Sequence, residues 1–168
     1  AAAQGRSALR IVPFDPALRE HFYRLNEAWL RKYFYVEEID HRVLSNPETE
    51  ILRSGGAILF AMLGDEVIGT CALLHESDGV YELTKMAVDE HRQGLGIGRA
   101  LMEAAIAEFR QRRGRRLFLE TNSKLTPALR LYESMGFEHQ PSIKPDSHYD
   151  RANVYMVWHD PQGAPPVP

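Results

Sequence analysis

Disulfide bonds and membrane spans are the first features that this sequence lacks. It contains one cysteine, Cys71, which excludes an internal disulfide, and the apolar neighbours of Cys71 (GTCALL) favour a buried, inert thiol over a reactive one. No apolar run is long enough to cross a bilayer, and no signal-peptide pattern opens the chain. We therefore expect a cytoplasmic enzyme or binding domain without a membrane partner.

A strong excess of charge and a metal-ligand pattern are also absent from the sequence. The 20 Lys and Arg against 23 Asp and Glu leave a net charge of −3, so no overall field favours nucleic acid or a membrane surface. The basic run at 110–116 (RQRRGRR) falls at the end of an expected helix, where cations are favourable, and we interpret it as a solvated helix end rather than an RNA contact. The seven histidines show no metal-ligand spacing, so we expect no metal.

The sequence does have the composition of an ordinary globular protein, with 44% apolar and 26% charged residues in a chain of 168. This length fits one domain with a sizeable core. We expect that domain at residues 9–160, after a flexible leader at 1–8 and before a proline-rich, disordered tail at 161–168.

Apolar periodicity and the positions of Gly and Pro predict the order of the helices and strands. The stretch 33–39 (YFYVEEI) has no clear period, so it either finishes a helix or forms a loop over a pocket. The resulting order, β-α-α-β-β-β-α-β-α-β-β, predicts a mixed α/β sheet with crossover helices late in the chain. Strands are expected at 9–12, 57–63, 67–74, 81–88, 117–119, from 137 and at 152–158, and helices at 16–29, 47–55, 97–110 and 126–135.

The fourth expected strand changes its apolar parity part-way. Tyr81 and Leu83 share one face of an ideal strand, whereas Met86 and Val88 share the other. A β-bulge near residues 84–85 would return both pairs to one face, and bulges often lie beside active sites. The alternative is a strand buried on both faces, for which parity carries no information. We favour the bulge.

A turn with three alternating glycines follows that strand. This segment, 94–98 (GLGIG), opens an expected helix whose N-terminal amides and dipole would attract an anion. A dinucleotide-binding G-x-G-x-x-G motif would need a glycine at Arg99 or Leu101, and a phosphate-binding P-loop would need G-K-[ST]. Both motifs fail, so these two kinds of nucleotide-binding site are excluded.

A third interpretation fits the glycine turn. The segment 93–98 (QGLGIG) resembles the Q/R-x-x-G-x-G/A element of the GCN5-related N-acetyltransferase (GNAT) superfamily. Asn122 and the segment 131–137 (LYESMGF) stand at the distances that the family shows. The resemblance covers residues 83–137, about a third of the chain. It implies an α/β fold with a mostly antiparallel central sheet, flanking helices, and splayed middle strands that form an acetyl-CoA cleft.

This resemblance implies where acetyl-CoA binds. Backbone groups of Met86 and Val88 would pair with the pantetheine arm as an added strand. Amides from Gly94 to Arg99 would hold the pyrophosphate, where a Cβ would obstruct the approach. Asn122 would lie near the pantetheine across the cleft. The implied cofactor-binding residues are Met86, Ala87, Val88, Gln93, Gly94, Leu95, Gly96, Ile97, Gly98, Arg99 and Asn122.

Acetyl transfer to an amine needs a neutral nucleophile, a stabilised carbonyl oxygen and a proton for the leaving thiolate. A lysine-like amine has a pKa about 3 units above neutral, so exposing its lone pair costs roughly 4–5 kcal/mol, and a general base helps. Glu82 precedes Met86 by four positions, as the base of histone-type family members does, and Tyr132 matches the family's general acid. The N–H of Val88 is implied as the donor to the carbonyl. The alternatives are an ordinary solvated glutamate and a core tyrosine.

The sequence specifies the acceptor least. In the family the first helices and the late strands bind it, and the candidates there are Tyr33, Glu38, Tyr149 and Arg151. Glutamate would suit a cationic amine, and arginine would suit an acceptor carboxylate. We expect an amine of a small molecule or amino acid to attack acetyl-CoA directly in a ternary complex, since Cys71 is expected in the core. A protein lysine or N-terminal acetyltransferase, a non-catalytic acyl-CoA sensor of the same fold, and a homodimer stay open.

Overall fold

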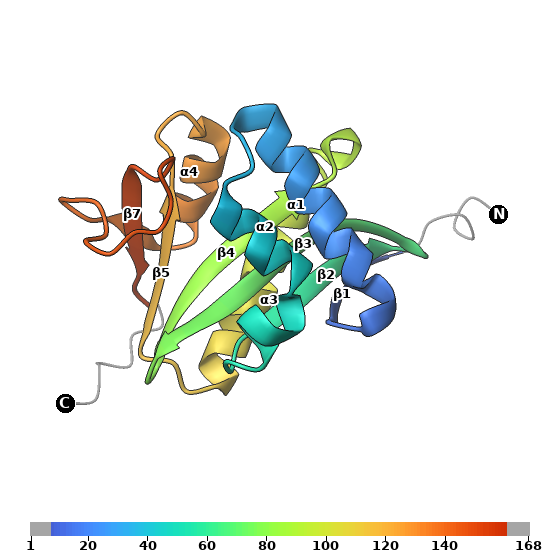
Figure 1. Ribbon diagram of the computed structural model, residues 1–168, viewed down its shortest axis with the longest axis horizontal. Helices are drawn as coiled ribbons and strands as arrows, with labels where there is room; N and C mark the ends of the chain where they lie inside the picture. The colour runs from blue at the N-terminus through green and yellow to red at the C-terminus, as the bar shows by residue number, and fades with distance from the viewer. Residues whose placement is uncertain (1–7, 161–168) are drawn as a thin grey trace.

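The computed structural model describes residues 8–160 and contains a seven-stranded sheet (Figure 1). Its strands are β1 (Leu9–Pro13), β2 (Ala57–Leu63), β3 (Glu66–Ser77), β4 (Val80–Val88), β5 (Arg116–Thr121), β6 (Phe137–His139) and β7 (Val154–Trp158). They follow the order β1-β2-β3-β4-β5-β7-β6, and every neighbouring pair is antiparallel except β4 with β5. The expected mixed, mostly antiparallel sheet is therefore confirmed.

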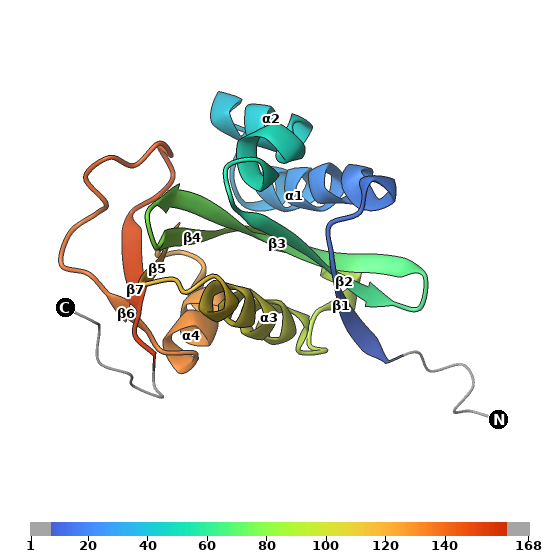
Figure 2. The same ribbon diagram turned by 90° about the horizontal axis from the view of Figure 1, so that it is seen from below.

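Helices cover both faces of this sheet (Figure 2). One face carries α1 (Arg19–Tyr33) and α2 (Glu38–Ser45), and the other carries α3 (Ile97–Gln111) and α4 (Thr126–Ser134). Within residues 8–160, no helix has the length and apolar character needed to cross a membrane. The leader expected at 1–8, except for its last residue, and the tail expected at 161–168 fall outside the described residues.

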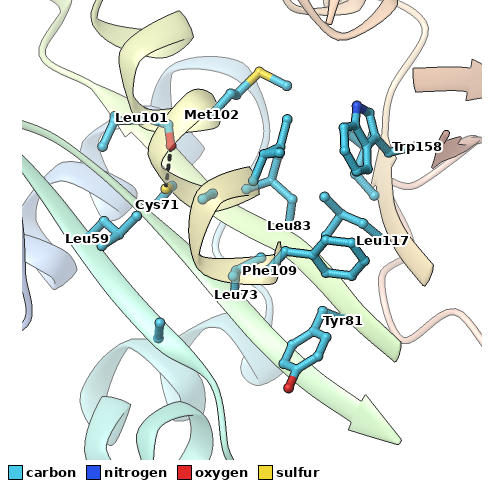
Figure 3. Packing of buried hydrophobic residues seen from close by; sticks show 14 of the residues in the cluster. Leu59, Cys71, Leu73, Tyr81, Leu83, Leu101, Met102, Phe109, Leu117 and Trp158 are labelled. Atoms are coloured by element: carbon cyan, nitrogen blue, oxygen red, sulfur yellow. Dashed lines mark hydrogen bonds between the residues drawn. The ribbon is translucent and has the colours of Figure 1, made fainter. Parts of the chain in front are cut away.

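An apolar core lies on each face of the sheet. The core under α3 and α4 contains Cys71, whose Sγ lies 3.8 Å from the carbonyl oxygen of Leu101 (Figure 3). Cys71 is fully buried, and burial raises the pKa of its thiol to about 12. The thiol is therefore a protonated core group at neutral pH, as predicted. The core under α1 and α2 includes Phe22, Leu44 and Phe60.

The predicted bulge is present in β4. The pairing of β4 with β3 shifts by one residue between Thr84 and Ala87. The residue responsible is Lys85, whose φ of 54° lies in the left-handed region, which is uncommon for residues other than glycine. The apolar side chains on both sides of the bulge consequently pack against the same core: Tyr81, Leu83, Met86 and Val88.

The helix α2 was not predicted. The sequence predicts a helix end or a loop at 33–39 and a short helix at 47–55. The structure has an additional helix, α2, before Pro47, and it has the expected short helix after Pro47 as a single helical turn at Glu48–Leu52. Proline disfavours a helical backbone in the residue that precedes it, so α2 ends there.

An uncommon cap starts α2. The carboxylate of Glu37 accepts a hydrogen bond from the backbone of Asp40, and the carboxylate of Asp40 accepts one from the Glu37 amide (3.0 Å). Glutamate is not among the residues that usually cap a helix N-terminus, so the start of α2 could not be recognised from the sequence. This reciprocal cap fixes the start of α2 against the site described next.

The strands β4 and β5 pair only near their beginnings. Residues 80–82 match residues 116–118, and beyond that point β5 diverges from β4 toward α4 (Figure 1). Two parallel strands that separate in this way leave backbone groups on their inner edges without ladder partners. The splayed middle strands that the resemblance implied are therefore confirmed.

Candidate active site

A groove of about 450 Å³, here named the turn groove, runs from the glycine turn past the start of α4. The first hydrogen bond at the start of α3 runs from the Ala100 amide to the Gly96 carbonyl (3.0 Å). The amides of residues 97–99 therefore have no acceptor within the helix. Arg99 and Lys124, which have no carboxylate partner among the described residues, line the same groove and add positive charge. These amides, the helix dipole and the two cations favour an anionic group at this end of the groove.

Two different structural constraints explain why the turn contains three glycines. Gly94 and Gly96 have φ values of 85° and 74°, in the left-handed region that glycine adopts without strain. A Cβ on either would meet no atom within 4 Å, so their backbone is open to the groove. A Cβ on Gly98 would instead lie 3.2 Å from Leu131 Cδ2 on α4. Gly98 thus serves the close packing of α3 against α4.

A second, smaller cavity of about 90 Å³, here named the inner cavity, lies between α1, β4, β5 and the segment before β7. Four side chains line both this cavity and the turn groove: Trp29, Met86, Leu125 and Tyr132. The two spaces therefore adjoin at these residues. A reaction between one molecule in the groove and another in the cavity would take place at this junction.

Tyr132 stands at the junction on α4. Its ring packs against Phe137, with ring centroids 6.2 Å apart. Burial raises the pKa of its phenol to about 12, with a smaller contribution from Cys71. Within the described chain the Tyr132 hydroxyl makes no hydrogen bond. The hydroxyl is therefore protonated at neutral pH, and no described residue accepts a hydrogen bond from it.

Glu82 lies in the inner cavity on β4. Its side chain is 8% exposed, and its carboxyl group makes no hydrogen bond to any residue in the described part of the chain. Burial raises the pKa of Glu82 to about 8, and the charge of Glu120 adds to this, whereas Lys85 opposes it. A carboxyl group that titrates near neutral pH beside a cavity is suited to take up and release protons.

Two cations beside the inner cavity are already paired with carboxylates. Lys85 Nζ donates to Asp40 Oδ1 (2.8 Å) and to the hydroxyl of Tyr149 (2.9 Å). Arg151 donates to both oxygens of Asp40 (2.7 and 2.9 Å) and to Glu37 (2.8 Å). Burial would raise the pKa of Asp40, but the bonds from Arg151 and Lys85 lower it to about 2. Two cations thus face two carboxylates, and this network carries no net charge.

The predicted site residues divide between the two spaces. The turn groove contains Tyr33, Met86, Val88, Gln93, Gly94, Gly96, Ile97, Gly98, Arg99 and Tyr132. The inner cavity contains Glu82, Met86, Asn122, Tyr132, Tyr149 and Arg151. Three predicted residues line neither space: Ala87 is buried under α1, Leu95 is exposed beyond the turn, and Glu38 is exposed on α2. The individual binding roles given to all these residues stay predictions.

Asn122 holds the rim of the inner cavity in place. Its Nδ2 donates to the carbonyl oxygen of Arg151 (2.7 Å), and its Oδ1 accepts from the amide of Lys124 (2.9 Å). The side chain thereby ties the turn after β5 to the segment before β7. This contact positions the wall of the cavity whether or not Asn122 also touches a ligand.

Sequence reasoning missed several residues that line the inner cavity, including Trp29, Lys85 and Glu120. Signals for two of them were present, because Lys85 and Glu120 are charged residues inside otherwise apolar strands. Their partners lie far away in the sequence, so the signal did not show what they would face. Among residues 8–160, no group of three or more His, Cys, Asp or Glu side chains is placed to hold a metal ion.

Residues 17–137 match the sequence model of the acetyltransferase (GNAT) family. The chain belongs to this family. The matched region is well over half of the chain and includes the glycine turn, the splayed strands and α4. The GNAT assignment therefore rests on the same elements that form the turn groove and the inner cavity.

Two curated relatives are longer than this chain. It is 32% identical over 117 residues to the mycothiol acetyltransferase of Acidothermus cellulolyticus, a match that covers 69% of this chain and 33% of the relative. It is 31% identical over 107 residues to the N-acetylaspartate synthetase of Rattus norvegicus, covering 62% of this chain and 36% of the relative. The chain thus spans about a third of the length of these relatives.

Solved structures show the same fold. An acetyltransferase from Salmonella typhimurium, solved with its cofactor acetyl-CoA, superposes with a TM-score of 0.74. The two sequences are 20% identical, and the match covers 96% of this chain and 99% of that one. At this identity the likeness establishes the GNAT fold alone.

Proposed function

We propose that this protein transfers an acetyl group from acetyl-CoA to a primary amine of a small molecule or amino acid, by direct attack in a ternary complex. The observation that carries the proposal is the position of Glu82. This buried carboxyl group, without a hydrogen-bond partner in the described chain, lines an inner cavity that adjoins the turn groove at Tyr132. An amine in the cavity would meet a thioester in the groove at that junction.

The residues of the turn groove fit acetyl-CoA, which supplies an activated acetyl thioester when bound. The free amides of residues 97–99 match an anionic pyrophosphate, and Gly94 and Gly96 leave the backbone open to it. Met86 and Val88 line the groove on β4, at the edge that β5 leaves unpaired. Their backbone groups would pair with the amide-containing pantetheine arm.

The raised pKa of Glu82 makes proton removal from an ammonium group less costly. An amine of pKa about 10.4 would lose its proton to an ordinary glutamate at a cost of roughly 8 kcal/mol. With Glu82 near pKa 8, the gap falls to about 2.4 units, or roughly 3 kcal/mol. Glu82 would take this proton directly or through one water.

Tyr132 would complete the transfer. As the C–N bond forms and the C–S bond breaks, the Tyr132 hydroxyl would donate its proton to the departing sulfur, the nitrogen would lose its second proton to water as it becomes an amide, and Glu82 would retain the first proton, which it took from the ammonium group. The amide of Val88 would donate to the carbonyl oxygen as negative charge develops there. Proton exchange with solvent would then return both side chains to their starting states.

A screen of amines, amino acids and peptides for release of free CoA tests the proposal. We expect at least one primary amine to release CoA in equal amount to acetylated product, without a burst of acetylated protein. Binding of acetyl-CoA without turnover of any acceptor would contradict the enzyme and favour the acyl-CoA sensor. Turnover of peptides alone would favour the protein acetyltransferase.

A further inference from the structure

Glu120 brings a second carboxylate to the inner cavity. Glu82 on β4 pairs with Phe118 on β5, and Glu120 lies two residues further along β5, on the same face of the sheet. Glu82 and Glu120 both line the cavity, and in the described chain neither carboxylate accepts a hydrogen bond. The two carboxylates therefore stand at the point where β4 and β5 begin to diverge, and they face the same space.

The nearby cations are committed to other carboxylates. Lys85 and Arg151, which line the cavity, are bonded to Asp40 and Glu37 in the neutral network. Lys144, which also acts on Glu82 electrostatically, is held by Glu76 (2.9 Å) and by Asp146. Among the described residues that line the cavity, Glu82 and Glu120 are thus the acidic or basic side chains that no oppositely charged group pairs. The remaining wall includes aromatic and aliphatic side chains, among them Trp29, Leu30, Phe34, Leu119 and Leu125.

On the basis of the proposed function, we propose that the acceptor is a cationic alkyl amine with no carboxylate beside its reacting nitrogen, and that Glu120 binds this cation while Glu82 accepts its proton. An α-carboxylate on the acceptor would lie against Glu82 and Glu120 with no free cation to neutralise it. An alkyl chain would pack against the apolar walls. Arg151 is not available to bind an acceptor carboxylate, because its guanidinium already donates to Asp40 and Glu37.

Matched pairs of acceptors, with and without a carboxylate beside the amine, test the proposed acceptor class directly. Agmatine and isoamylamine lack the carboxylate that arginine and leucine carry next to the amine, and they are otherwise closely similar in shape. We expect kcat/KM for CoA release to be about 100-fold or more higher for the decarboxylated member of each pair, because like charges across a contact repel strongly. Comparable or faster turnover of arginine and leucine would overturn the proposal.

The Glu120→Gln variant tests whether Glu120 binds the cationic acceptor. We expect kcat/KM for isoamylamine to fall about 10-fold or more and the preference within each pair to narrow. The acidic limb of the pH profile should also move to lower pH, because removal of the Glu120 charge lowers the pKa of Glu82. The other charged groups that act on Glu82 stay in place: Lys85 on β4, Glu76 on β3 and Lys144 before β7. Glu103→Gln, the same change at an exposed position of α3, is the control.

A binding measurement separates the two proposals. Calorimetric titration of isoamylamine and leucine into the protein saturated with CoA reports the acceptor class without turnover. Preferential binding of isoamylamine, weakened by Glu120→Gln but without any CoA release from acetyl-CoA, would support the acceptor class and contradict the transferase. CoA release with no preference for the decarboxylated acceptors would support the transferase and overturn the acceptor class, whereas a preference unchanged in Glu120→Gln would overturn the role of Glu120. Absence of both binding and turnover would overturn both.

Discussion

The ammonium of Lys85 lies 2.8 Å from the carboxylate of Asp40, and both side chains are buried. Lys85 is the bulged residue of β4, and Asp40 belongs to the capping box of α2. Arg151 extends the pair to the segment before β7. The irregular point of β4 is thereby joined to two elements that are distant in sequence, and these elements enclose the inner cavity.

Removal of the Asp40 charge should destabilise the fold. In Asp40→Asn, Lys85 and Arg151 would lose their shared carboxylate while still largely buried, which typically costs about 3–5 kcal/mol. Urea unfolding followed by circular dichroism measures the change. Glu38→Gln, two residues earlier on the exposed side of α2, should change the free energy of unfolding by less than about 0.5 kcal/mol. Equal midpoints for Asp40→Asn and Glu38→Gln would show that the network does not hold the fold.

Charge at the glycine turn should control cofactor binding. Gly96→Glu and Gly96→Gln impose the same backbone strain at φ 74°, but only glutamate places a negative charge where the helix amides favour an anion. We expect acetyl-CoA to raise the Tm of the native protein, to raise that of Gly96→Gln less, and to leave that of Gly96→Glu unchanged. Thermal unfolding with and without acetyl-CoA measures this. Normal stabilisation of Gly96→Glu would place the anion site elsewhere.

The Tyr132 hydroxyl should matter for turnover more than for binding. Tyr132→Phe keeps the ring that packs on Phe137 and removes the proton donor, so kcat should fall about 10²-fold or more while the Kd for acetyl-CoA changes little. Steady-state kinetics and titration calorimetry separate the two effects. Tyr155→Phe is the control, because Tyr155 lies on β7 and lines neither the turn groove nor the inner cavity. Unchanged turnover in Tyr132→Phe would remove it as the general acid.

The pH dependence of activity should follow Glu82. If Glu82 is the base, kcat/KM should rise with pH and level off above about pH 8, where the carboxyl group is ionised. Glu82→Gln should remove most of the activity and abolish the rise of kcat/KM with pH. A profile that levels off near pH 4.5, or an active Glu82→Gln protein with the native profile, would assign the base elsewhere.

The same group should make stability depend on pH. Between pH 4.5 and about 8 the folded chain keeps the Glu82 proton that the unfolded chain releases, so the free energy of unfolding falls as pH rises through this window. Glu82→Gln should lose this dependence and be more stable than the native protein at pH 8.5, by an amount on the order of 5 kcal/mol at most. Urea unfolding at pH 5 and 8.5 tests the prediction, with exposed Glu103→Gln as the control. An equal pH dependence in both variants would contradict it.

Local patterns in the sequence were sufficient for much of the fold. The change of apolar parity in β4 predicted the bulge, because side chains alternate along a strand and a buried face tolerates no slip. The glycine turn and the start of α3 were also predicted, since left-handed turns and helix N-termini depend on neighbouring residues. The helix α2 was missed because its cap uses glutamate, and its position depends on contacts with Lys85 and Arg151.

What the sequence determined by itself is therefore local: the order of elements apart from α2, the bulge, the glycine turn and the family to which the chain belongs. Tertiary structure alone decided which charges meet. Glu82 and Glu120 come together only through the parallel pairing of β4 with β5, across an intervening helix. Lys85 and Arg151 are neutralised only because α2 folds over the bulge, and no periodicity in the sequence encodes those distances.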